Sequence, residues 1–172
     1  MSENKIEVLI LIGSESDHKR IEKLAPALEW FGISHELKVS SAHRNPELTV
    51  ELARKAHERG VKIIIAAAGM AAHLPGVIAA HTPLPVIGVP LDASPLKGVD
   101  ALYSIVQMPP GVPVAAVGID AAVNAAVLAA KILALNDERI SHRLDEFIKA
   151  GCKIPNPDEP EPKRLKTLDF GL

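Results

Sequence analysis

Short aliphatic runs that end at glycine alternate with amphipathic stretches along most of this chain. The first run, Val8–Ile12, is closed by Gly13, and a continuous apolar run of this length is typical of a strand buried on both faces. From Ser16 onward, apolar residues follow the spacing of an amphipathic helix, which Gly32 ends. Pro26 lies inside that helix and predicts a kink or an early end, because proline has no N–H to donate.

The same alternation continues through the rest of the chain. We expect four further strands, at residues 36–39, 63–67, 86–89 and 114–117. Helices are expected to begin at Pro46, near His73, at about Leu96 and after Asp120, which is placed to cap a helix that runs to Leu135; a last amphipathic helix ends at Gly151. This order predicts an α/β fold, a three-layer, doubly wound parallel sheet of five strands, flavodoxin-like, with right-handed crossovers.

At 172 residues, the chain has the length of a single domain. We expect a flavodoxin-like catalytic domain over residues 1–151, including a C-terminal helix, and an extended arm over residues 152–172. The arm is expected because four prolines and mixed charges fill this short stretch. The helix after Asp120 is rich in alanine, and two uses remain open for it: covering the sheet of its own subunit, or packing against another subunit.

Composition narrows the class of partner. Aromatic residues make up 3% of the chain, and none lies between Phe31 and Tyr103, which argues against stacking platforms for single-stranded nucleic acid. The formal net charge of −2 argues against nucleic acid and anionic membranes. The longest apolar block, residues 63–72, is about half as long as a membrane-spanning helix, the chain starts without a secretory pattern, and Cys152 is the single cysteine. We therefore expect a cytoplasmic protein with a small-molecule partner, and no nucleic acid or membrane.

The loops that follow the expected strands are the places to look for a site, because ligands of such sheets bind beyond the carboxyl ends of the strands. The first loop, Gly13–Asp17, carries two serines at the start of a helix. Free backbone N–H groups and hydroxyls at a helix start suit a phosphate. The same serines could serve only as helix caps.

Two further loops carry polar or unusually small residues. Ser41, His43 and Arg44 follow the second expected strand; arginine can clamp a phosphate or carboxylate, and histidine can move a proton near neutral pH. Small residues surround Gly69 after the third, where they would let a ligand approach the backbone, and a helix starting near His73 would direct N–H groups at a carboxylate. Packing between helices could equally explain the small residues.

The chemistry left open by these loops is proton transfer. They hold no cysteine or acidic nucleophile and no His-x-x-x-His pair, so metal and covalent mechanisms are poorly supported. A fourth loop, residues 108–113, contains three prolines and a glycine. Its stiffness suits the rim of a pocket, although turn geometry alone could account for it.

Together, the loops resemble those of the class I N5-carboxyaminoimidazole ribonucleotide mutases, also called the catalytic subunit of phosphoribosylaminoimidazole carboxylase. Five motifs stand in the family's order: Gly13-Ser14-x-Ser16-Asp17, Ser41-Ala42-His43-Arg44, Ala71-Ala72-His73-Leu74-Pro75-Gly76, Leu84-Pro85-Val86-Ile87-Gly88-Val89-Pro90 and Ser104-Ile105-Val106-Gln107-Met108-Pro109. The resemblance covers about residues 8–135. Ala67 and Met70 stand where the family usually has glycine, and a methionine would be strained if that position needs a positive φ.

The resemblance implies an isomerase of de novo purine (IMP) synthesis that moves a carboxylate from the exocyclic nitrogen of an aminoimidazole ribonucleotide to a ring carbon, through trapped carbon dioxide and without a cofactor or metal. It implies a homo-octamer with active sites at subunit contacts. His43 would shuttle the proton. The residues implied in substrate binding are Ser14, Asp17 and Arg44 for the ribonucleotide, Ser41 near its phosphate, and Gly69, Ala71, Ala72, His73 and Leu74 at the carboxylate and carbon dioxide end.

Two other readings stay open at this point. Direct carboxylation of aminoimidazole ribonucleotide by carbon dioxide is the reaction of the class II relatives, which typically carry lysine after the motif histidine and lack the Ala-His-Leu-Pro-Gly segment. Arg44 and the complete segment favour the mutase. A flavodoxin-like module that binds a nucleotide without converting it is the third reading, and in it His43 would be dispensable.

Overall fold

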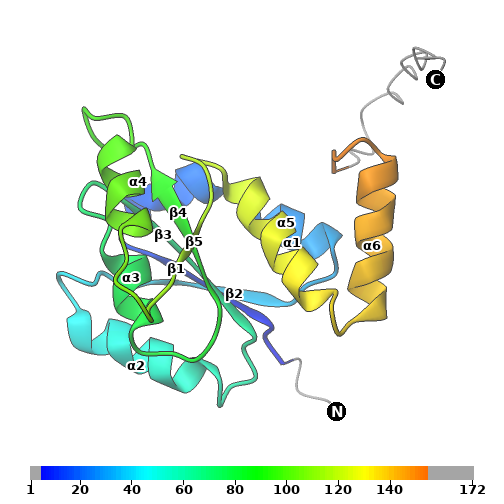
Figure 1. Ribbon diagram of the computed structural model, residues 1–172, viewed down its shortest axis with the longest axis horizontal. Coiled ribbons are helices and arrows are strands. Elements are labelled where there is room, and N and C mark those ends of the chain that lie inside the picture. Colours follow the sequence, from blue (N-terminus) through cyan, green and yellow to red (C-terminus); the bar gives the residue numbers. More distant parts are fainter. Residues whose placement is uncertain (1–4, 155–172) are drawn as a thin grey trace.

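Five parallel strands form one sheet in the order β2-β1-β3-β4-β5. The computed structural model describes residues 5–154, and the ribbon shows the sheet between two groups of helices (Figure 1). The strands are β1 (Val8–Ile12), β2 (His35–Val39), β3 (Ile63–Gly69), β4 (Val86–Leu91) and β5 (Ala115–Ala116). This strand order is that of flavodoxin-like folds, so the expected fold class is confirmed. The division at residue 151 stays a prediction, because most of the arm, residues 155–172, lies outside the described residues.

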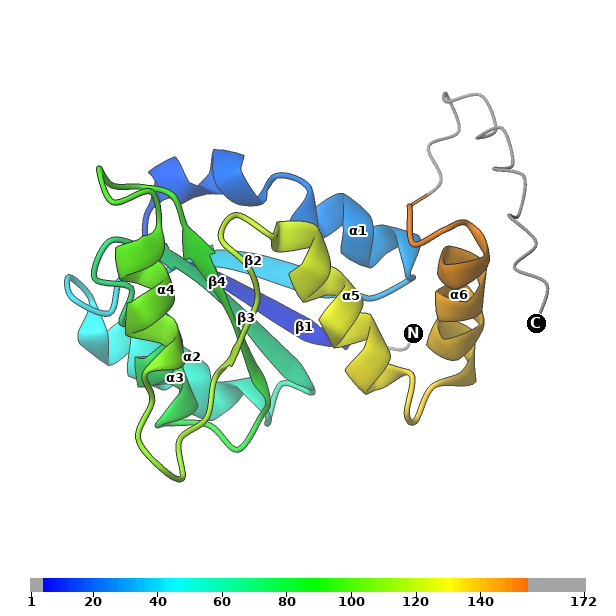
Figure 2. The same ribbon diagram turned by 45° about the horizontal axis from the view of Figure 1, so that its top comes forward.

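Alternate residues of the strands build two separate apolar layers. Ile10 of β1 belongs to the layer that packs on α1 (Leu24–Trp30) and α5 (Ala122–Leu133). Leu9 belongs to the opposite layer, covered by α2 (Pro46–Ala56), α3 (Leu74–Ala79) and α4 (Val99–Val106). Both views show this division of the helices (Figure 2). Every residue of β1 is buried, as a strand covered on both faces requires.

The alanines of α5 serve the sheet of their own chain. Ala122, Ala125, Ala126, Ala129 and Ala130 are buried in the layer shared with β1 and β3. Their small side chains let α5 approach α1 closely, and the last helix, α6 (Glu138–Lys149), packs on the outside of α5. The first of the two expected uses of this helix is therefore confirmed.

The expected helix from Ser16 to Gly32 is interrupted. A 3-10 helix, η1 (Glu15–Ile21), is followed by α1, which begins at Leu24. Pro26 lies in the first turn of α1, where its missing N–H leaves no helical hydrogen bond unmade. The interruption expected from Pro26 is present, but the break precedes the proline.

The sequence prediction was wrong about Asp120. Asp120 has a φ of 53°, and the N-cap of α5 is Ala121, which has no capping side chain. The Asp120 carboxylate instead accepts a hydrogen bond from the backbone N–H of Asp92 and pairs with Arg20. Two long-range partners have replaced the local cap.

The fourth strand, expected at residues 86–89, continues through Pro90 to Leu91. The carbonyl of Pro90 accepts a hydrogen bond from the Asp120 N–H at 2.9 Å, so the proline nitrogen also faces this side of β4. The last residue of β4 that pairs with β5 is Gly88. Pro90 therefore removes no ladder hydrogen bond, which is the condition for proline in a strand.

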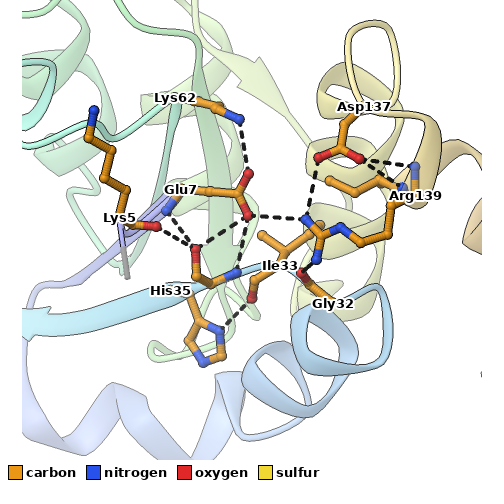
Figure 3. A network of polar contacts seen from close by, with 10 residues as sticks. Lys5, Glu7, Gly32, Ile33, His35, Lys62, Asp137 and Arg139 are labelled. Atoms are coloured by element: carbon orange, nitrogen blue, oxygen red, sulfur yellow. Dashed lines mark hydrogen bonds and ion pairs between the residues drawn. The ribbon is translucent and has the colours of Figure 1, made fainter. Parts of the chain in front are cut away.

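A polar network fastens the other end of the molecule, at the amino ends of the strands (Figure 3). The carboxylate of Glu7 lies 2.9 Å from Lys62 Nζ and 3.8 Å from an Nη of Arg139. Arg139, in α6, donates to the carbonyl of Gly32, and Asp137 caps the same helix by accepting from two backbone N–H groups. The network ties α6 to the sheet and leaves the carboxyl ends of the strands free. Between residues 5 and 154, no helix has both the length and the apolar character needed to cross a membrane.

Candidate active site

A cavity of about 530 Å³ lies at the carboxyl ends of the central strands. The loops after β1, β2, β3 and β4 all contribute to its wall. The lining residues are Gly13, Ser14, Ser16, Asp17, Ser41, Ala42, His43, Arg44, Ala68, Gly69, Met70, Ala71, His73, Leu74 and Ala93. The site is therefore where a doubly wound sheet is expected to bind its ligand.

Two histidines from different loops meet in this cavity. Nε2 of His43 lies 2.8 Å from Nδ1 of His73, and the two rings meet nearly edge to face. One nitrogen must carry the hydrogen and the other must accept it, because imidazole has one N–H when neutral. His43 precedes α2 and His73 is the N-cap of α3. The pair joins the second and third motifs through a contact that can pass a proton.

Arg44 joins the first two loops. Its guanidinium donates to the carbonyl of Gly13 at 3.1 Å, and its backbone N–H donates to the hydroxyl of Ser41 at 3.3 Å. The Ser14 hydroxyl accepts from the backbone N–H and the hydroxyl of Ser16. Ser14 is thus the N-cap of η1 and also a lining residue of the cavity. A positive charge and three hydroxyls share one part of the wall, which suits an anion.

The carboxylate of Asp17 is buried beside this positive part of the cavity, with 7% of the residue exposed. Burial raises the pKa of Asp17 above its ordinary value of 3.8. A backbone hydrogen bond with Ser14 and the charges of Arg20 and Arg44 oppose the rise. Asp17 therefore presents an acceptor whose protonation state depends on two nearby guanidinium groups.

The third loop is built by close contact with the loop after β4. A Cβ placed on Gly69 would lie 2.4 Å from the Cβ of Ala93, so the backbone here admits only glycine. The next residue, Met70, has a φ of 56°, a region that favours glycine. The strain expected for methionine at this position is present. Met70 lines the cavity and is 58% exposed, so its side chain has room to move.

All of the site residues expected from the sequence line this cavity except Ala72. Ala72 is buried in the core layer beneath the loop, together with Leu74. Ala93 was missed because its loop, residues 92–98, carries none of the motifs. Its position after a buried strand was the available signal.

The proline-rich loop, residues 108–113, contributes no lining residue to this cavity. The sulfur of Met108 would lie 3.0 Å from a Cβ placed on Gly76, at the start of α3. Within this chain the loop therefore packs against α3, and the expectation that it forms the rim of the cavity is not met. Among residues 5–154, no three of the metal-ligating side chains lie together.

Comparison with known proteins identifies the family. Residues 7–152 match the family model described as AIR carboxylase. The N5-carboxyaminoimidazole ribonucleotide mutase of Pyrococcus abyssi is 54% identical over 82% of this chain and 81% of the relative, and that of Pyrococcus horikoshii is 48% identical over 99% and 94%. A crystal structure of Treponema denticola PurE superposes with a TM-score of 0.73 at 31% identity, over 84% of this chain and 90% of the other. The chain belongs to the AIR carboxylase family.

Proposed function

We propose that this protein is an N5-carboxyaminoimidazole ribonucleotide mutase, which interconverts that compound and 4-carboxy-5-aminoimidazole ribonucleotide in purine biosynthesis. The observation that carries the proposal is the pair of imidazoles, 2.8 Å apart, between an anion-binding wall and a wall of small residues. Relatives with the mutase name align over most of this chain.

The two walls give the substrate one orientation. Its phosphate lies with Ser14, Ser41 and Arg44, where hydroxyls and a guanidinium supply donors. Its imidazole and carboxylate lie along the loop from Gly69 to Leu74, where the small residues Gly69 and Ala71 leave room for the ring and for carbon dioxide. Asp17 accepts a hydrogen bond from the ribonucleotide. His43 lies between the two ends.

The reaction needs one bond broken, one bond formed and one proton moved. The bond between the exocyclic nitrogen and the carboxylate breaks, releasing carbon dioxide, and His43 gives that nitrogen a proton. The ring carbon then attacks the carbon dioxide with its enamine electrons. Neutral His43 takes the proton from that carbon, so the imidazole returns to its first state and nothing else is consumed. His73 holds His43 by their shared hydrogen bond.

Retention of carbon dioxide is the main task of the cavity. Holding the gas against the ring carbon replaces an encounter in solution by an intramolecular step, which is worth up to about 7–11 kcal/mol when the geometry is good. Small residues around Gly69 bring the backbone close to the reacting atoms. No cofactor is part of the proposed reaction.

The proposal includes a homo-octamer with active sites at subunit contacts. It is supported by exposed apolar residues on α4 and just before it, which are 43–63% exposed: Leu96, which precedes the helix, and Val99, Tyr103 and Val106 within it. Exposed apolar residues gathered in this way are typical of an interface. Light scattering of the full chain tests the octamer; a monomer at micromolar concentration would contradict it.

Because the reaction uses soluble ribonucleotides, the proposal includes a cytoplasmic location.

A turnover assay tests the reaction. The protein is offered the carbamate in one arm, and 5-aminoimidazole ribonucleotide with bicarbonate in the other. A mutase converts the carbamate far faster, whereas preference for the second arm would mean direct carboxylation. In His43→Asn we expect interconversion to be lost while ribonucleotide binding stays within about tenfold, since the side chain moves a proton and does not hold the phosphate. Unchanged turnover in that variant would remove His43 from the mechanism, whereas a wild-type protein that binds the ribonucleotide and converts neither substrate would leave the non-catalytic module as the better account.

A further inference from the structure

Asp120 contacts two segments that contribute residues to the cavity. One is the 3-10 helix η1, which contributes Asp17, and the other is the loop after β4, which contributes Ala93. Neither Asp120 nor Arg20 lines the cavity, yet each of them contacts a segment that does. These contacts cross 28 and 100 residues of sequence.

The first contact of Asp120 is to the loop after β4. Its Oδ1 accepts the backbone N–H of Asp92 at 3.0 Å, and its own N–H donates to the carbonyl of Pro90 at 2.9 Å. Asp92 precedes Ala93, the lining residue whose Cβ crowds Gly69. A shift of Asp92 would therefore move the wall at which the carboxylate end of the substrate is proposed to lie.

The second contact of Asp120 is to η1. Its Oδ2 lies 3.0 Å from Nη1 of Arg20, which is the residue three positions after Asp17 in the same 3-10 helix. Both side chains of this ion pair are more than one-third exposed, so the pair contributes little to stability. The pair links η1 to the residue that also holds the loop after β4.

The backbone of Asp120 adopts an unfavourable conformation to make both contacts. Its φ of 53° is in the left-handed region, which a residue other than glycine seldom adopts. Aspartate and asparagine tolerate the region better than most residues. Strain of this kind persists only where surrounding contacts fix it, and it is found at functional sites.

We propose that Asp120 is a positioning residue, which sets the separation of the η1 wall and the β4-loop wall of the cavity through Arg20 and the Asp92 amide. The inference rests on the proposed function for its activity readout. It concerns residues outside the substrate contacts and assigns them no chemistry with the substrate.

Two substitutions at Asp120 separate its contacts. Asp120→Asn keeps an oxygen that can accept the Asp92 N–H but removes the charge that pairs with Arg20. Asp120→Gly accepts the positive φ without strain and removes both side-chain contacts, while the backbone N–H can still donate to Pro90. With the carbamate as substrate, we expect Asp120→Gly to lower kcat/KM by about tenfold or more, since misplacement of a binding wall has effects of this size. For Asp120→Asn we expect a smaller loss.

A matched control is available in Lys97. Lys97 also has a positive φ, of 56°, and lies in the loop after β4, and its side chain makes no hydrogen bond or ion pair with any of the residues that the structure describes. Lys97→Gly therefore makes the same backbone change without removing a side-chain contact between η1 and the loop after β4. We expect its kcat/KM to stay within about twofold of the wild-type value. An Asp120→Gly variant that is equally unchanged would overturn the inference.

A second readout tests the contact between Asp120 and Arg20 and does not depend on turnover. Arg20 and Arg44 both act on the Asp17 carboxyl by charge. Asp120→Asn removes the negative charge that pairs with Arg20, so the Arg20 charge acts more strongly on Asp17, and carbon-13 NMR titration should show a lower pKa for Asp17 in this variant. In Arg20→Gln the same pKa should rise. Shifts of the same sign in the two variants, or no shift in either, would overturn the inference even if Asp120→Gly did not fold.

Failure of the wild-type protein to convert the carbamate would contradict the proposed function. It would leave the pKa test intact, because that test does not use turnover.

Discussion

Nε2 of His43 and Nδ1 of His73 share a hydrogen bond of 2.8 Å across two loops of the sheet. The residues are 30 positions apart, and each precedes a helix that packs on the same face of the sheet. A histidine fixed by a second side chain keeps one orientation and one tautomer, which a proton shuttle needs. Under the proposed function, His73 is therefore the residue that orients His43.

Two substitutions of His73 separate the effect of losing the hydrogen bond to His43 from the effect of losing side-chain volume. In His73→Asn the amide can take the place of Nδ1 in the contact, whereas His73→Leu fills the space without a polar atom. We expect His73→Leu to lower kcat by at least about tenfold, because the shuttle loses its orientation. For His73→Asn we expect most of the rate to remain. Single-turnover rates with saturating carbamate check this; equal loss in the two variants would argue against the hydrogen bond as the cause.

Replacing Arg44 should weaken binding of the ribonucleotide. A charge-assisted hydrogen bond to a phosphate is typically worth about 1.5–3 kcal/mol, so we expect Arg44→Ala to bind the substrate more weakly by that amount. Arg44→Lys keeps the charge but loses the planar arrangement of N–H donors, so its affinity for the substrate should lie between that of the wild type and that of Arg44→Ala. Calorimetric titration with the unreactive aminoimidazole ribonucleotide measures the effect. Wild-type affinity in Arg44→Ala would remove the residue from the site.

Asp17→Asn should make the free energy of unfolding less dependent on pH. The pKa of Asp17 is raised in the folded protein by burial, so folding disfavours its ionised form. The wild-type protein therefore loses stability as the pH rises from the unfolded value of 3.8 through the raised folded value, and the loss persists at neutral pH. Relative to wild type, the variant gains stability at about pH 7 and none at about pH 3.

Urea unfolding at the two pH values checks the prediction for Asp17. A variant that is less stable than wild type at neutral pH would contradict it, since the Arg44 and Arg20 charges would then outweigh burial. The same variant should bind the ribonucleotide more weakly, because a neutral amide is a weaker acceptor than a carboxylate. A variant that is more stable but binds the ribonucleotide more weakly is what we expect if the carboxylate of Asp17 serves binding at a cost in stability.

Met70→Gly should stabilise the fold. The φ of 56° costs a residue with a side chain on the order of 1–2 kcal/mol, and the entropy that glycine loses on folding offsets part of the gain. We expect a net increase of about 0.5–1 kcal/mol in the free energy of unfolding. Met70→Ala keeps the strain and removes the thioether, so it serves as the control. Equal stability of the two variants in urea would show that backbone strain at this position has no measurable cost.

Local patterns predicted the strands and most of the residues that line the cavity, because the signals are local. A strand buried on both faces needs consecutive aliphatic residues, and Val8–Ile12 and Ile63–Ile65 provide them without reference to the rest of the chain. The helix that begins at Pro46 was predicted well for the same reason. Because the strands are parallel, the loops that follow them meet at one edge, so His43, Arg44 and His73 could be placed near one another from their order alone.

Other features depended on contacts between distant segments. Asp120 has the position of an N-cap in the sequence, yet the tertiary structure offers its carboxylate the Asp92 N–H and Arg20, and these partners prevail. Ala93 has no chemical signal, and its role follows from the 2.4 Å approach that makes Gly69 obligatory. Ala72 lies inside a matching motif but is buried in the core.

The sequence by itself determined the alternation of strands and helices, the edge of the sheet that carries the site, and the side chains with chemistry at that edge, since each of these depends on neighbours within a few residues. Only the tertiary structure decided that His43 contacts His73 through Nε2 and Nδ1, that Met70 adopts a positive φ, and that Asp120 ties two walls of the cavity. The physical reason is that hydrogen bonds and close packing between distant segments are set when the layers assemble, and they override weak local preferences.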